Sequence, residues 1–141
     1  MTTTQELTTL LKRTQHALEL TLDRHLQAVG LTPAQYTALR ALDEDAKLSN
    51  AELARRCFVT AQTMHRVVGL LEHNGLVTRK AHPAHGRIQE LSITRKGRTA
   101  MTKARKVVDG VEATAFVDLS DRDGRTVTRV LQRSLGVLVE G

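Results

Sequence analysis

The fold of this chain is decided by residues 49–97, which read SNAELARRCFVTAQTMHRVVGLLEHNGLVTRKAHPAHGRIQELSITRKG. Ser49 and Glu52 have the S-x-x-E spacing of a capping box, which predicts that a short helix begins here. Thr60 is placed to cap a second helix, and only the turn Phe58-Val59 separates the two. Two short helices joined by so brief a turn predict a helix-turn-helix. The predicted inner face of the second helix consists of Met64, Val67, Val68 and Leu71.

The periodicity changes after this second helix. Residues 76–80 and 88–93 have the composition of short strands, and the second alternates between apolar and polar side chains. Residues 81–86 lie between them and contain Pro83 and Gly86, which favour a turn. A β-hairpin that follows a helix-turn-helix directly is a wing, so we expect a winged helix-turn-helix.

Longer helices are predicted on both sides of this region. Residues 4–29 form an amphipathic helix, and Thr32-Pro33-Ala34-Gln35 has the spacing that opens the next one. A long helix follows Gly97, and Ser120 is placed to cap a last helix. The apolar stripes of these terminal helices are larger than a winged-helix core can cover. We therefore expect an obligate homodimer.

Composition and charge point to a nucleic-acid partner. The 141 residues include 40% hydrophobic side chains, enough for one core, so we expect a single domain. Nine of the 21 basic residues but only one of the 15 acidic residues lie between Arg79 and Lys106, which gives this stretch a charge of +8. A local basic excess favours an acidic partner such as DNA. Aromatic residues make up only 2%, which disfavours the base-stacking surface of single-stranded nucleic-acid modules.

Several classes of protein are disfavoured. Cys57 is the only cysteine and cannot form an intrachain disulfide, and we see neither a secretory signal nor an apolar run long enough for a bilayer. These features predict a cytoplasmic protein with no membrane partner. Phosphate-binding glycine loops, nucleophile elbows and paired-acid motifs do not occur. We therefore expect no enzymatic activity and no cofactor.

In its order and spacing of motifs the chain resembles the MarR family of bacterial transcriptional regulators. The matching pieces are Leu31-Thr32-Pro33-Ala34-Gln35-Tyr36, Leu53-Ala54, Leu71-Glu72-His73-Asn74-Gly75-Leu76-Val77, Arg79, Arg87 and Leu91-Ser92-Ile93-Thr94-Arg95-Lys96-Gly97. The resemblance implies a homodimer that reads a palindromic operator in double-stranded DNA, one half-site per subunit. It also implies a repressor that releases DNA when a small phenolic or other lipophilic effector binds, as many members of the family do.

The resemblance sets the expected fold and its subdivision. We expect a mainly α fold with a small β-wing, formed by one MarR-type domain over residues 1–141. Residues 31–95 are expected to form the DNA-binding lobe, and residues 1–30 and 96–141 the dimerisation helices. One departure is visible in the wing, where the family usually has Asp-Pro-x-Asp and this chain has His82-Pro83-Ala84-His85. The replacement removes two acids that brace the wing arginine.

The predicted DNA-binding residues lie on the second short helix and the wing. Gln62 has the amide that reads adenine, and Arg66 has the guanidinium that reads guanine or holds a phosphate. A merely solvated helix face is the alternative, but the wing and the basic excess favour DNA. The residues are Thr60, Ala61, Gln62, Thr63, His65 and Arg66 on the helix and Arg79, His85 and Arg87 in the wing.

The resemblance also implies a pocket for a small effector. The family's effector pocket lies between the first helix, the helix after Thr32 and the helix after Gly97, and there the resemblance implies polar groups from His16 and Tyr36.

Two alternatives to a DNA regulator stay open: a winged-helix module for protein or RNA, and a metal- or redox-sensing regulator. His82 and His85 lack further metal ligands beside them, so we expect no metal site. Cys57 is expected to be buried and inert.

Overall fold

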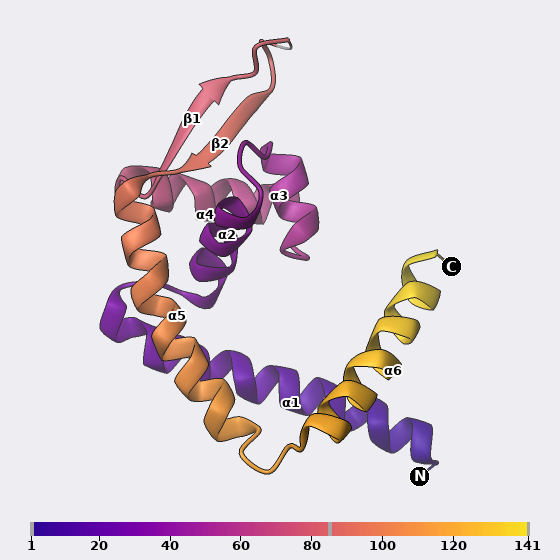
Figure 1. Cartoon of the computed structure of the whole chain (residues 1–141). Coiled ribbons are helices and arrows are strands. Elements are labelled where there is room, and N and C mark those ends of the chain that lie inside the picture. The colour runs from indigo at the N-terminus through magenta and orange to yellow at the C-terminus, as the bar shows by residue number, and fades with distance from the viewer. Residues whose placement is uncertain (1, 85, 141) are drawn as a thin grey trace. The chain divides into compact units, whose positions relative to one another are not determined.

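A computed structural model describes residues 2–84 and 86–140 of the chain. Its elements follow the predicted order of helices, hairpin and helices (Figure 1). They are α1 (Thr3–Leu26), the 3-10 turn η1 (Gln27–Val29), α2 (Pro33–Glu44), α3 (Asn50–Arg56), α4 (Ala61–His73), β1 (Val77–Ala81), β2 (Gln89–Ile93), α5 (Arg95–Ala115) and α6 (Asp121–Glu140). The chain forms two compact units, Met1–Val111 and Glu112–Gly141. The prediction of a mainly α fold with a small β-wing is confirmed.

The helices begin at the predicted capping residues. The Oγ1 of Thr32 accepts a hydrogen bond from the N–H of Gln35 at 3.1 Å, and the Gln35 side chain accepts one from the Thr32 N–H at 3.0 Å. Ser49 makes the same reciprocal pair of bonds, and Thr60 and Ser120 each accept one from the backbone three residues later. These bonds satisfy N–H groups that the first helical turn leaves without partners.

The wing is an antiparallel hairpin that projects from the helices (Figure 1). Its register runs from Val77 opposite Ile93 to Ala81 opposite Gln89. The N–H of Leu91 donates to the carbonyl of Leu48 at 2.7 Å, which anchors the hairpin to the segment that leads into α3. The helix-turn-helix and the wing are therefore one continuous structure.

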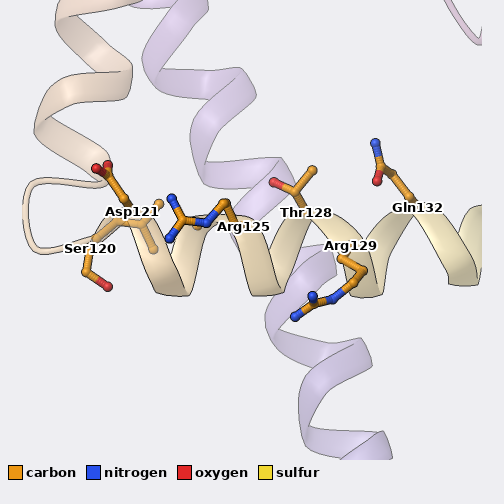
Figure 2. Close-up of a pocket in the computed structure, with 8 residues that line it drawn as sticks. Ser120, Asp121, Arg125, Thr128, Arg129 and Gln132 are labelled. Carbon is orange, nitrogen blue, oxygen red and sulfur yellow. The ribbon is translucent and has the colours of Figure 1, made fainter.

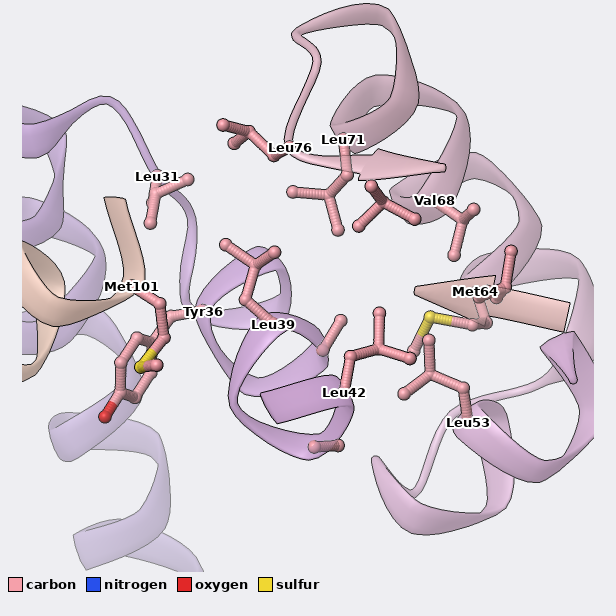
Figure 3. Close-up of a cluster of buried hydrophobic side chains, with 14 of the residues drawn as sticks. Leu31, Tyr36, Leu39, Leu42, Leu53, Met64, Val68, Leu71, Leu76 and Met101 are labelled. Atoms are coloured by element: carbon pink, nitrogen blue, oxygen red, sulfur yellow. The ribbon is translucent and has the colours of Figure 1, made fainter. Parts of the chain in front are cut away.

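A single hydrophobic cluster holds α2, α3, α4 and the hairpin together (Figure 3). Figure 3 shows Tyr36 and Met101 at one end of this cluster and Leu53 and Met64 at the other. Side chains that are 2% exposed or less include Leu26, Leu39, Leu42, Leu53, Met64, Val68, Leu71, Leu91 and Met101. Burial of this kind contributes about 25 cal/mol for each Å² of apolar surface removed from water. The core of the winged helix is thus completed within the chain.

The start of α5 is fixed tightly to the turn between α4 and β1. The Oγ1 of Thr94 accepts a hydrogen bond from the N–H of Gly97 and donates one to the carbonyl of Gly75. Gly97 is buried, and a Cβ at this position would collide with the carbonyl oxygen of Leu76 and stand 2.9 Å from a side-chain carbon of Ile93. Glycine is therefore required where α5 leaves the wing.

Other helices leave apolar side chains uncovered. On α1, Leu7, Leu10, Leu11 and Leu20 are between 41% and 59% exposed. On α6, no described residue is buried, although apolar side chains recur at helical spacing. Those of α6 are Val127, Val130, Leu131, Leu135 and Leu138. Among the described residues, no helix is both long and apolar enough to cross a membrane.

Candidate nucleic-acid interface

The outer face of α4 carries the polar side chains that the sequence predicted. Ala61, Gln62, His65 and Arg66 are exposed, while Thr63 is half-buried. On the opposite face lie Met64, Val68 and Leu71, which are buried, and Val67, which is half-buried. The amide of Gln62 and the guanidinium of Arg66 thus stand on an uncovered helix face.

The N-terminus of α4 is suited to an anion. The Oγ1 of Thr60 accepts a hydrogen bond from the Thr63 N–H at 3.1 Å and also lies 3.0 Å from the Thr63 hydroxyl. The cap leaves the N–H groups of Ala61 and Gln62 at the open end of the helix, where backbone dipoles favour negative charge. A phosphate group is the anion that DNA would supply there.

Asn50 holds α4 in position. Its Nδ2 donates to the carbonyl oxygen of Ala61 at 3.0 Å and so ties the first residue of α3 to the first residue of α4. Its Oδ1 is the one buried side-chain oxygen or nitrogen without a hydrogen bond among the described residues. Asn50 was not predicted as a site residue, because a bond across 11 residues leaves no local signal in the sequence.

The wing presents Arg87 to solvent and turns His82 inward. Arg87 is exposed in the loop between β1 and β2, whereas His85 lies outside the described residues. The Nδ1 of His82 accepts a hydrogen bond from the Ala84 N–H at 3.0 Å, and its Nε2 stands 3.4 Å from a carboxylate oxygen of Glu90. His82 therefore braces the base of the loop, in a wing where the family's acids are missing.

Arg79 has a partner within the chain. Its Nε lies 3.2 Å from the carboxylate of Glu72, and its side chain is only 18% exposed. This ion pair joins β1 to the last turn of α4. Arg79 stays a predicted DNA contact, but it would have to share its guanidinium with Glu72.

The basic excess lies mostly on α5 and not on the wing. Of the nine basic residues between positions 79 and 106, the wing holds Arg79, Lys80 and Arg87. The others are Arg95, Lys96, Arg98, Lys103, Arg105 and Lys106, all on α5 and all exposed. Arg98 is paired with Asp43 at 3.0 Å, and the Nζ of Lys96 donates to the carbonyl of Asn74. The wing therefore carries three of these nine cations and α5 carries six.

The two predicted effector residues occupy different environments. His16 is exposed on α1, whereas Tyr36 is 7% exposed and belongs to the hydrophobic cluster. A shallow groove of about 390 Å³ lies elsewhere, along α6, where Figure 2 shows the side chains that line it. Its labelled residues are Ser120, Asp121, Arg125, Thr128, Arg129 and Gln132.

The structure also bears on the two sensor alternatives. No group of three or more His, Cys, Asp or Glu side chains that could hold a metal ion occurs in the described part of the chain. Cys57 was expected to be buried, but it is half-buried because α3 ends at Arg56 and leaves Cys57 at its cap. Burial raises the pKa of the Cys57 thiol, although Arg56 opposes the effect, so the thiol is favoured over the thiolate.

Comparison with known proteins gives consistent results. A sequence model of the MarR family matches residues 29–88. The HTH-type transcriptional repressor Rv2887 of Mycobacterium tuberculosis is 34% identical over 124 residues, which are 88% of this chain and 89% of the relative. The crystal structure of Rv2887 with p-aminosalicylic acid matches with a TM-score of 0.74 at 33% identity, over 92% of this chain and 98% of that chain. The repressor CouR, bound to a 23-mer DNA duplex, matches with a TM-score of 0.77 at 27% identity, over 89% of each chain.

Proposed function

Since this chain belongs to the MarR family of transcriptional regulators, we propose that it is a ligand-responsive repressor that binds a palindromic operator as a homodimer. The observation that carries the proposal is the uncovered polar face of α4, with Gln62 and Arg66 beside an open helix N-terminus. The wing arginine, Arg87, is exposed on the adjoining hairpin. A helix for the major groove and an arginine for the minor groove are the two parts that a winged reader of DNA needs.

Each part has a distinct role in this proposal. Gln62 and Arg66 read base edges in the major groove, and Thr60, Ala61, Thr63 and His65 lie against the backbone around them. Arg87 enters the minor groove, where it responds to groove width and potential more than to base identity. Arg79 and His85 support the wing contact.

The dimer follows from the apolar side chains that the chain leaves exposed. Residues 31–95 form the DNA-binding lobe, and residues 1–30 and 96–141 are the dimerisation segments. The stripes on α1 and α6 are the surfaces that a second copy would cover, since exposed apolar patches of this extent mark interfaces. Two-fold symmetry of the dimer requires a palindromic operator with half-sites about one helical turn apart.

The effector is proposed to be a small aromatic acid or phenol. Structures of the M. tuberculosis relative are in complex with salicylic acid and with p-aminosalicylic acid. In this chain Tyr36 and His16 are the proposed polar contacts. Tyr36 is buried against the core, so an effector would reach it by displacing core contacts and would thereby bias the position of the lobe.

No catalytic role is proposed, because a regulator of this kind acts by binding alone. We place the protein in the cytoplasm, together with the DNA that it regulates. The competing function is a winged-helix module that docks a protein or RNA. The polar face of α4 and the low aromatic content favour duplex DNA over single-stranded RNA.

Selection of duplexes from a random library, followed by salt titration of the recovered sequence, tests the proposal. The expected product is a palindrome bound by a dimer. Its affinity should fall steeply with salt and should exceed that for a scrambled duplex by about 10³-fold or more. Recovery of no preferred sequence, or binding that does not respond to salt, would contradict a DNA-reading function.

A further inference from the structure

Phe58 combines two features that are unfavourable in the isolated chain. It follows α3 with φ 57°, in the left-handed region that bulky residues rarely adopt. The residue is 82% exposed, more than any other large hydrophobic residue that the structure describes. The backbone is therefore strained and the ring gains little from burial.

The strained backbone belongs to the turn that ends α3. The N–H of Val59 donates to the carbonyl of Ala54 at 3.1 Å, and the N–H of Phe58 lies 3.4 Å from the carbonyl of Arg55. This is the bonding pattern of a Schellman motif, in which glycine is the usual residue at the position of Phe58. Glycine would remove both unfavourable features without disturbing the turn. An aromatic residue here calls for a reason outside the folding of the chain itself.

The position of Phe58 indicates what that reason is. The residue lies two positions before Thr60, the cap of α4, and so at the end of the helix proposed to enter the major groove. Exposed Arg55 precedes it in the last turn of α3 and places a cation on this surface, whereas Arg56 is paired with Asp45 at 2.8 Å. A turn that carries a cation and continues the proposed DNA surface favours a nucleic acid as the occupant over an apolar protein surface.

We propose that Phe58 is an apolar contact to DNA, with its ring packed against a deoxyribose or a thymine methyl group beside the N-terminus of α4. Thymine methyls are the apolar groups of the major groove, and Phe is among the residues that pack on them. The inference rests on the proposed function and adds an uncharged residue to the proposed DNA contacts. The same turn thus gives up stability of the free protein in favour of affinity for DNA.

An apolar contact and a phosphate contact differ in their response to salt. A lost cation reduces the number of counterions released and flattens the dependence of affinity on salt. Loss of the phenyl ring does not change the number of counterions released, so it should lower affinity by the same factor at every salt concentration. Loss of Phe58 is therefore distinguishable from loss of Arg87.

The test compares three variants with the wild type on the duplex recovered by selection, at several salt concentrations. Phe58→Gly removes the ring and the strain, and Phe58→Leu keeps an apolar side chain. Lys47→Gly is the matched control for strain, because Lys47 is exposed and has φ 66°. Thermal melting and sedimentation of each variant accompany the binding measurements.

Phe58→Gly should melt about 2–4 °C higher than the wild type, remain a dimer, and bind the duplex roughly tenfold more weakly with an unchanged salt slope. Phe58→Leu should keep most of the affinity. Lys47→Gly should gain the same stability and keep its operator affinity. Wild-type affinity in Phe58→Gly, a flattened salt slope, or a weakened dimer would each overturn the contact. Failure of the wild type to bind any duplex would defeat the proposed function itself.

Discussion

The winged lobe and the α6 helix both carry regular apolar stripes, but only the lobe buries its own. On α4, Met64, Val68 and Leu71 are each 1% exposed or less. On α6, Leu131 and Leu135 remain 39% and 49% exposed. Amphipathic spacing therefore predicts which face of a helix is apolar, but it does not tell whether the chain itself or a second molecule covers that face.

This difference divides the expected effects of substitution into two kinds. A change in the completed core should alter stability at every protein concentration. A change on an uncovered stripe should act through assembly and so depend on concentration, because mass action couples folding to dimerisation.

The largest effect is expected from Leu131→Asp on the α6 stripe. A carboxylate within an apolar dimer interface would be desolvated without a partner, so the dimer should dissociate. Operator binding should fall by more than about 100-fold, since a monomer reaches only one half-site. Sedimentation and a gel shift measure both effects.

Arg129→Gln is the control for this prediction. It changes the net charge by the same amount on the face of α6 opposite Leu131, where Arg129 lines the groove shown in Figure 2. It should leave the dimer and the operator affinity unchanged. A dimeric Leu131→Asp protein would place the dimer interface elsewhere.

Arg66→Ala should remove DNA recognition and leave the lobe folded. Arg66 is exposed on α4, so its truncation opens no cavity. The expected loss is about 1–3 kcal/mol at each half-site if the guanidinium reads a guanine. Titration of the selected and scrambled duplexes measures it, together with thermal melting.

Arg105→Ala is the matched control, because it removes the same charge from the exposed face of α5. If affinity depended only on net charge, both variants would weaken binding equally. Equal losses would assign recognition to the basic excess as a whole and would contradict the role of the α4 face.

The sequence predicted the elements but not the contacts between them. Caps at Thr32, Ser49 and Thr60 are local signals, because donor and acceptor lie three residues apart. The ion pair of Arg79 with Glu72 depends on how β1 meets α4, and that of His82 with Glu90 depends on the register of the hairpin, so no local pattern predicted either pair.

The candidate site divides in the same way. The inward and outward faces of α4 followed from helical spacing, and the residues of this helix that were predicted to contact DNA are exposed except half-buried Thr63. The helix predicted after Gly97 already placed Arg98, Lys103, Arg105 and Lys106 outside the wing, but the pairing of Arg98 with Asp43 became visible only in the structure. Phe58 was recognised as part of a turn, but its positive φ became visible only in the structure.

Gly97→Ala tests how complete the core of the lobe is. The new Cβ would collide with the Leu76 carbonyl, a backbone atom that cannot rotate away. The expected loss is about 3 kcal/mol of unfolding free energy, at the upper end of the range for overpacking. Denaturant unfolding measures it, and the loss should be the same at every protein concentration.

Gly110→Ala lies on the same helix, where a Cβ meets no atom within 4 Å. The free energy of unfolding of this variant should rise by about 0.5–1 kcal/mol, because alanine has a higher helix propensity than glycine. A Gly97→Ala protein as stable as the wild type would mean that α5 shifts freely against the turn before β1, contrary to a rigid attachment of the wing.

The smallest effects are expected at the cap of α3, which lies wholly within the completed lobe. Ser49→Ala removes the Oγ that accepts the Glu52 N–H and should cost about 1 kcal/mol. The hydroxyl and the backbone N–H of Ser49 hold the pKa of Glu52 below its ordinary range. Glu52→Gln keeps the capping geometry and removes only the charge, so its cost should be smaller.

The lowered pKa of Glu52 determines how the difference in stability between the wild type and Glu52→Gln depends on pH. As pH falls, the unfolded chain takes up a proton at Glu52 before the folded chain does, so the carboxylate favours the folded state above the unfolded pKa. That contribution disappears as pH falls through the lower, folded pKa. The stabilities of the wild type and Glu52→Gln should therefore differ at neutral pH and converge in acid, at every protein concentration. A gap that persists at acid pH would show that the charge of Glu52 is not its source, and a gap that changes with protein concentration would show that Glu52 acts through assembly and not through the cap.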